Sequence, residues 1–206
     1  MPRFKLLLIS GAGGVGKTTL LRKIGASVDS LTQIVDVGDF RSFAMNSNIT
    51  IDGKSPSEEF WLRTLHAAAN IDTFKDLCAE IQTFLIEPII KSSILRRTEA
   101  CVVTSGHIIP GRFDQKKFPD IDIIEILLVI SDKEQHWRRY GERQKRRSNN
   151  PLYDKTQNEK AKFEKCRTLQ EYMIQCAQKA GVQIIENDEQ ALGAIVKQLG
   201  GTKHGK

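Results

Sequence analysis

The chain has 206 residues, of which 40% are hydrophobic and 27% are charged, and its formal net charge is +6. That length and composition suit one α/β domain with a substantial core, residues 1–206. No apolar run approaches the roughly 20 residues that a membrane-spanning helix needs, and the four cysteines form no CxxC pair. We therefore expect a cytoplasmic protein with reduced thiols and no membrane partner.

The predicted elements alternate between strands and helices along the chain. The apolar run Phe4–Ile9 is typical of a strand that is buried on both faces, and a helix is expected from the segment GKTT to about residue 26. Further strands are expected at 33–37, 100–103, 123–130 and 182–185. Further helices are expected from the capping box at 55–58, along the apolar stripe 74–85 to an end near Pro88, from Asp132, at 157–180 and at 189–199. This alternation predicts a three-layer αβα sandwich with a parallel sheet.

The segment SGAGGVGKTTL, which follows the first strand, contains the pattern Gly-x-x-x-x-Gly-Lys-Thr. Between a strand and a helix, this pattern forms a phosphate-binding loop, or P-loop. Its glycines let successive backbone N–H groups point at phosphate oxygens, and the helix N-terminus adds its positive end. The residues expected to bind the nucleotide are Gly11, Gly13, Gly14, Val15, Gly16, Lys17, Thr18 and Thr19.

Two side chains of this loop have further expected roles. Lys17 should reach the β- and γ-phosphates and act in catalysis, and the Thr18 hydroxyl should ligate Mg²⁺. The expected cofactors are therefore ATP and Mg²⁺, although the sequence leaves ATP against GTP open.

The rest of the chain narrows the class of P-loop protein. The nearest match to a guanine-reading Asn-Lys-x-Asp motif is Glu186-Asn187-Asp188, which is not one, and the third strand ends in Val-Thr-Ser instead of the Asp-Glu of motor-type ATPases. The basic stretch Arg138–Arg147 suits the lid of a small kinase, which closes over the phosphates. We place this lid region at about 132–155. A solvated helix face or a nucleic-acid patch remains an alternative.

Three segments outside the loop carry a family resemblance. They are SGHIIPG at 105–111, the run His136-x-x-Arg139-Tyr140-x-x-Arg143, and the segment 167–187. In their order and spacing they resemble the 2-phosphoglycerate kinase family, and with the P-loop the resemblance covers residues 5–199. It implies a fold like that of nucleoside-monophosphate (NMP) kinases and ATP-dependent phosphorylation of a small metabolite.

Two departures from that family concern acidic and basic positions. Thr104 stands where the family has Glu at the end of its third strand, and in Asp39-Phe40-Arg41 the arginine comes one place early. Asp36 or Asp39 could supply the missing carboxylate, because both follow a strand on the side where ligands bind.

The remaining candidate residues are cationic or acidic side chains near strand ends and in the basic helix. Arg139 and Arg143 lie four residues apart, hence on one helix face, and are expected to be catalytic lid arginines. The residues expected to bind the acceptor are Asp39, Arg41, His107 and Arg112. Surface salt bridges, loop cations and a structural histidine are the alternative interpretations.

The function predicted from these features is ATP-dependent transfer of the γ-phosphoryl group to a small metabolite such as 2-phosphoglycerate. The acceptor-side helical region is expected at about 39–92. One alternative is a nucleotide or polynucleotide 5′-end kinase, in which the basic helix grips a nucleic-acid backbone. Another is an ATP-binding sensor without catalysis, to which Thr104 would point.

Overall fold

The computed structural model describes residues 3–28, 32–38, 70–96, 98–148 and 159–199. Five strands form one sheet in the order β2-β3-β1-β4-β5, and every neighbouring pair is parallel. The strands are β1 (Phe4–Ser10), β2 (Thr32–Asp36), β3 (Ala100–Ser105), β4 (Ile121–Val129) and β5 (Gln183–Glu186). The carboxyl ends of parallel strands meet at one edge, so the loops that follow them gather there.

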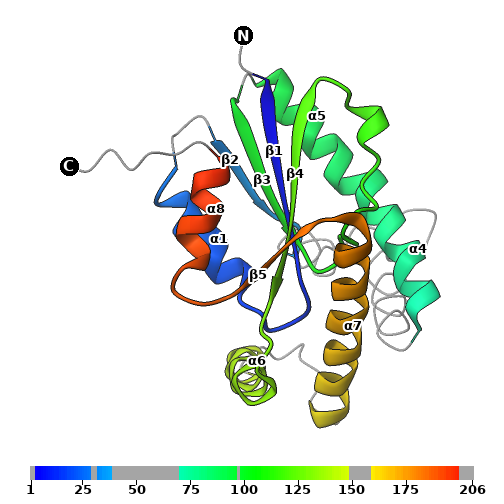
Figure 1. Cartoon of the computed structure of the whole chain (residues 1–206), viewed down its shortest axis with the longest axis vertical. Coiled ribbons are helices and arrows are strands. Elements are labelled where there is room, and N and C mark those ends of the chain that lie inside the picture. Colours follow the sequence, from blue (N-terminus) through cyan, green and yellow to red (C-terminus); the bar gives the residue numbers. More distant parts are fainter. Residues whose placement is uncertain (1–2, 29–31, 39–69, 97, 149–158, 200–206) are drawn as a thin grey trace.

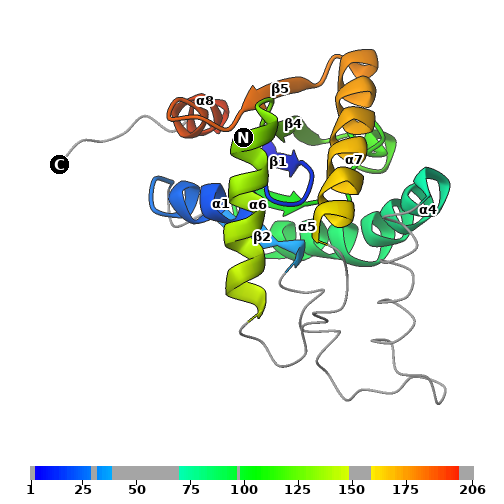
Figure 2. The same ribbon diagram turned by 90° about the horizontal axis from the view of Figure 1, so that it is seen from below.

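Helices cover both faces of this sheet, as Figure 1 shows. One face carries α1 (Lys17–Gly25) and α8 (Ala191–Gln198). The other carries α4 (Ile71–Ile81), the π-helical turn η1 (Gln82–Ile86), α5 (Glu87–Leu95) and α7 (Glu159–Ala180). A short 3-10 turn, η2 (Gln115–Lys117), precedes β4, and α6 (Lys133–Ser148) runs across the carboxyl ends of the strands (Figure 2). The predicted three-layer αβα sandwich, with the P-loop after its first strand and an NMP-kinase-like architecture, is confirmed.

The central strand β1 shows why the sheet needs two helical layers. Leu7 and Ile9 pack against α1 and α8, whereas Leu6 and Leu8 pack against α4 and α5, and all four side chains are 0% exposed. Because both faces are covered, the strand has no polar alternation, which accounts for its continuous apolar run. Burial of a leucine or isoleucine contributes about 1.5–3 kcal/mol, so this strand anchors the P-loop that follows it.

Within the described residues, the predicted elements agree with the observed ones except near Pro88, where the expected helix end is wrong. The helical path continues to Leu95. Pro88 lies in the first turn of α5, where its missing N–H is tolerated. The preceding turn η1 is π-helical and is closed by the Glu87 N–H, which donates to the Gln82 carbonyl. This wider turn leaves room for the proline ring.

Several predicted segments lie outside the described residues: the capping box at 55–58, residues 39–69 of the acceptor-side region and residues 149–155 of the lid region. Among the helices that the structure describes, none is both long and apolar enough to cross a bilayer.

Candidate active site

The P-loop adopts positive-φ backbone conformations that require glycine at three positions, which are Gly11, with a φ of +153°, Gly14 and Gly16. Gly14 and Gly16 both have a φ of +89°, in the left-handed region. Gly16 is also the N-cap of α1, so the first turn of that helix opens onto the loop. A methyl group at Gly16 would lie 2.5 Å from Asn187 Nδ2, so the loop is closely packed on its outer side.

The Lys17 side chain lies across the loop. Its Nζ donates to the carbonyl oxygens of Gly11 at 2.7 Å and Ala12 at 2.9 Å. A methyl group built on Gly106 would lie 3.8 Å from the same Nζ. The segment that follows β3 therefore lies beside the Lys17 ammonium group.

Thr18 is paired with a carboxylate from the neighbouring edge strand. Its Oγ1 donates to Asp36 Oδ2 at 2.6 Å, and the other carboxylate oxygen accepts from the Gly38 N–H at 2.8 Å. Asp36 is the register partner of Thr104, whose hydroxyl is fully buried and finds no partner among the described residues. Of the two acids considered for the missing carboxylate, Asp36 lies at the loop, and Asp39 is outside the described residues.

This Thr18–Asp36 pair fits Mg²⁺. A hydroxyl and a carboxylate are hard oxygen ligands, and Mg²⁺ in nucleotide sites takes one or two such protein ligands beside water and phosphate oxygens. Within the described ranges, no group of three or more His, Cys, Asp or Glu side chains could hold a metal by itself. A partial site of this kind needs a nucleotide phosphate to complete it.

The two arginines predicted for the lid lie at the P-loop. Helix α6 begins where the Asp132 carboxylate accepts from the Gln135 N–H at 2.6 Å. A methyl group at Gly13 would lie 3.1 Å from Arg143 Nη1, and one at Gly16 would lie 3.8 Å from Arg139 Nη1. The structure thus brings both guanidinium groups together on one side of the loop.

An aromatic cluster fixes α6 against α7. The rings of His136, Trp137 and Tyr140 lie 5.1, 5.0 and 5.5 Å from the Phe163 ring, centroid to centroid. His136 is 0% and Tyr140 is 3% exposed. Such aromatic contacts contribute about 0.5–1.5 kcal/mol each beyond their burial, so α6 is held in place along its first half.

His136 also contacts the P-loop directly, which the sequence pattern did not indicate. Its Nε2 lies 2.8 Å from the Gly13 carbonyl oxygen, and its Nδ1 lies 3.5 Å from Arg167 Nη1. These partners assign the hydrogen to Nε2, which donates to the carbonyl, and leave Nδ1 as an acceptor. Burial lowers the pKa of His136; the hydrogen bond to Gly13 opposes that effect, and the nearby Arg167 and Lys17 cations add to it.

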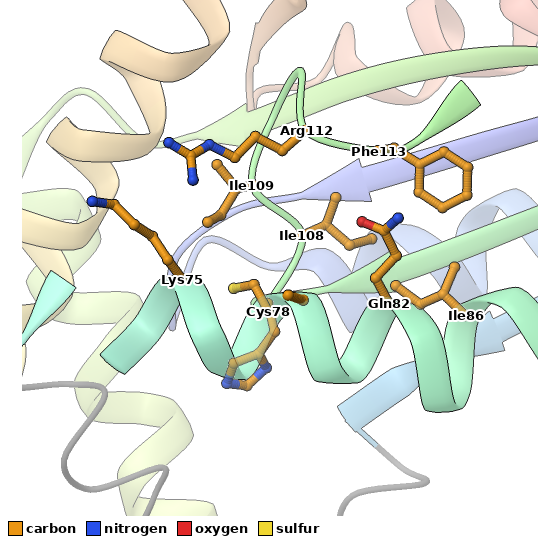
Figure 3. Close-up of a pocket in the computed structure, with 10 residues that line it drawn as sticks. Lys75, Cys78, Gln82, Ile86, Ile108, Ile109, Arg112 and Phe113 are labelled. Carbon is orange, nitrogen blue, oxygen red and sulfur yellow. The ribbon is translucent and has the colours of Figure 1, made fainter. Parts of the chain in front are cut away.

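A pocket of about 120 Å³ lies between α4, η1 and the segment after β3 (Figure 3). His107 and Arg112, two of the four residues predicted to bind the acceptor, both line it. Asp39 and Arg41, the other two, lie outside the described residues. Because Gly106 directly precedes His107, the segment that borders Lys17 continues into the wall of this pocket.

Lys75 is a lining residue that sequence reasoning missed, because it follows Phe74 in a helix interpreted only as core. Its charged end lies at the same end of the pocket as that of Arg112 (Figure 3), and it pairs with Asp72 at 2.6 Å. The other walls are largely apolar, and burial raises the pKa of Cys78, whose thiol stays neutral. None of the described lining residues is acidic, and the charged residues among them are Lys75 and Arg112.

A comparison with models of known protein families finds no match, and a search of curated protein sequences finds none either. Solved structures do resemble this chain. TT1252 from Thermus thermophilus is 15% identical, with 97% of this chain and 99% of that chain covered and a TM-score of 0.51. A shikimate kinase from Acinetobacter baumannii, solved in complex with shikimate, is 15% identical, with 96% and 92% covered and a TM-score of 0.49. The likeness to TT1252 supports the fold described above.

Proposed function

We propose that this protein is an ATP-dependent kinase that transfers the γ-phosphoryl group to a small anionic metabolite. The observation that carries the proposal is the continuity of residues 105–107, which border the Lys17 ammonium group at Gly106 and enter the pocket wall at His107. A phosphate held by the loop and an acceptor held in the pocket would then be neighbours, as direct transfer requires.

The chain's own residues suit each part of such a transfer. Lys17 would leave the Gly11 and Ala12 carbonyls and bind phosphate oxygens, which are stronger acceptors because they are charged. Arg143 lies beside Gly13 and Arg139 beside Gly16 of the loop, from where their guanidinium groups would balance charge on the transferring group. Bound Mg²⁺ would neutralise phosphate charge, and Thr18 and Asp36 are the residues that would hold it.

The charge of the pocket supports an acceptor with a carboxylate or phosphate group. Arg112 and Lys75 would bind that group, and His107, which directly follows Gly106, would be a titratable side chain beside it. A volume of about 120 Å³ suits a small molecule, so 2-phosphoglycerate, which the sequence resemblance suggests, is the first acceptor to test. The same volume does not favour a polynucleotide end.

The alternative of an ATP-binding sensor without catalysis rests on Thr104, which stands where an acidic residue was expected. Asp36 weakens it, because this carboxylate lies one strand away and already accepts from Thr18. A sensor would bind Mg-ATP yet form no ADP with any acceptor.

The test is acceptor-dependent ADP formation by the purified full chain with Mg-ATP. The panel comprises 2-phosphoglycerate, other small phosphorylated and carboxylic acids, nucleoside monophosphates and a 5′-hydroxyl oligonucleotide, with Lys17→Ala as the blank. Turnover with one small anion, lost in both Lys17→Ala and Arg112→Ala, supports the proposal. Turnover only with a nucleotide or oligonucleotide, or Mg-ATP binding without turnover, contradicts it in favour of the corresponding alternative.

A further inference from the structure

Two side chains outside the P-loop hold carbonyl groups of that loop. His136 Nε2 donates to the Gly13 carbonyl at 2.8 Å, and Asn187 Nδ2 donates to the Val15 carbonyl. His136 belongs to α6, whereas Asn187 follows β5 directly. Two separate elements therefore bind alternate carbonyls of one short segment.

The geometry of the peptide bond links these contacts to the N–H groups of the loop. In a trans peptide the carbonyl and the following N–H point in opposite directions, and no cis peptide occurs among the described residues. With the Gly13 carbonyl bound to His136, the Gly14 N–H points away from α6. With the Val15 carbonyl bound to Asn187, the Gly16 N–H points away from that side chain in the same manner.

The glycines of the loop make these hydrogen bonds from outside it necessary. Gly14 and Gly16 both have a φ of +89°, and a glycine backbone changes between left- and right-handed conformations at little cost. The peptides on either side of them could therefore rotate and present a carbonyl oxygen, instead of an N–H, to a bound anion. A hydrogen bond from outside the loop opposes that rotation.

We propose that His136 and Asn187 are positioning residues for the phosphates of the bound nucleotide. Each holds one loop carbonyl outward, so that the N–H groups of Gly14 and Gly16 face the phosphate oxygens. This inference rests on the proposed function in one respect, since it takes the loop to bind a nucleotide polyphosphate.

Both positioning residues are themselves fixed by contacts on the far side. Arg167 lies against His136 Nδ1 and donates to the Ile130 carbonyl at 2.8 Å, and the Phe163 ring packs on the imidazole edge. The Asn187 backbone N–H donates to the Val129 carbonyl at 2.9 Å, and its carbonyl accepts from Arg139 at 3.3 Å. A loop held by residues that are themselves restrained in this way loses less freedom when it binds phosphate.

The test compares variants that keep or lose each hydrogen-bond donor. His136→Met fills the imidazole space without a donor, His136→Gln restores an N–H at a similar position, and Asn187→Leu replaces the donating amide with an uncharged side chain of similar size. Calorimetric titration would measure the affinity of each full-length protein for Mg-ATP and for Mg-tripolyphosphate, which has no base or sugar. We expect His136→Met and Asn187→Leu to weaken the binding of both ligands by about five- to tenfold, the effect of one lost hydrogen bond, and His136→Gln to stay within about twofold of the wild type.

The comparison of His136→Gln with His136→Met separates positioning from simple packing. If His136 only filled space, His136→Gln would bind no better than His136→Met, and that result would overturn the inference, as would wild-type affinity in both donor-free variants. Wild-type protein that binds neither ligand would instead refute the proposed function.

A second measurement needs no variant and covers the case in which one fails to fold. The amide proton resonances of Gly14 and Gly16 in the wild-type protein should shift on addition of Mg-ATP, because their N–H groups acquire phosphate acceptors. If the protein binds Mg-ATP and these two resonances do not move, the inference is wrong.

Discussion

Replacing Gly16 by alanine should destabilise the protein by an amount that the geometry around the loop determines. A left-handed φ costs a non-glycine residue about 1–2 kcal/mol, and Gly16 has a φ of +89°. The new methyl group would also lie 2.5 Å from Asn187 Nδ2, so the amide must move and lose its hydrogen bond to Val15, which costs about 1 kcal/mol more. The expected loss in the free energy of unfolding is therefore about 2–3 kcal/mol.

The chain offers two matched controls for this substitution. Gly181 has a φ of +67°, but a methyl group there would meet no described atom within 4 Å, so Gly181→Ala should cost only the backbone strain of about 1–2 kcal/mol. Gly193 is an exposed position inside α8 with the same open surroundings, and Gly193→Ala should stabilise the protein by up to about 1 kcal/mol because alanine is the better helix former.

Urea unfolding at equilibrium, followed by circular dichroism, would measure all three variants beside the wild type. With a slope of about 2 kcal/mol per molar urea, Gly16→Ala should lower the midpoint by about 1 M or more, and Gly181→Ala by clearly less. A midpoint for Gly16→Ala equal to or above that of Gly181→Ala would refute the close packing of Asn187 on the P-loop. Of the three variants, only Gly16→Ala should bind Mg-ATP more weakly than the wild type.

Three further outcomes are expected. Burial lowers the pKa of His136 below its usual 6.5, so the unfolded chain takes up this proton at a higher pH than the folded protein does. As the pH falls below 6.5, the free energy of unfolding of the wild type, relative to that of His136→Gln, should therefore fall by up to about 1.4 kcal/mol per pH unit. A difference in urea midpoints between the two proteins that does not change with pH would contradict this expectation. Arg143→Ala should lower kcat by about 10³-fold or more with a much smaller change in Mg-ATP affinity, whereas unchanged turnover in steady-state assays would remove Arg143 from the catalytic residues. Asp36→Asn should raise the Mg²⁺ concentration for half-maximal activity by about tenfold or more, which a Mg²⁺ titration at fixed ATP would measure. A titration curve identical to that of the wild type would exclude Asp36 as a Mg²⁺ ligand.

The fold was predictable because its signals are local. The run Phe4–Ile9 and the P-loop pattern each occupy consecutive residues, so the buried strand, the turn and the start of α1 follow from short-range chemistry. Pro88 misled the prediction because a proline normally ends a helix, and only the hydrogen bonding of η1 shows how this one is accommodated.

The candidate site was predictable only in part because its contacts join distant segments. The contact of His136 with Gly13 spans 123 residues, and that of Asn187 with Val15 spans 172. Both residues belong to segments that carry the family resemblance, but a single sequence gives their position in the chain and not their direction in space. The choice of Asp36 as the partner of Thr18 depended likewise on the pairing of β2 with β3.

The π-helical turn η1 has a consequence for how this pocket could change in evolution. A π turn holds one residue more than an α turn, and Gln82 and Ile86, at its two ends, both line the pocket. Because the extra residue is taken up within that single turn, deletion of one residue between them would restore an α-helix and leave α5 in nearly the same orientation relative to α4. Ile90, now fully buried, would then stay in the core. A change in the shape of this pocket could thus arise through the length of this helix, without new apolar residues on α5.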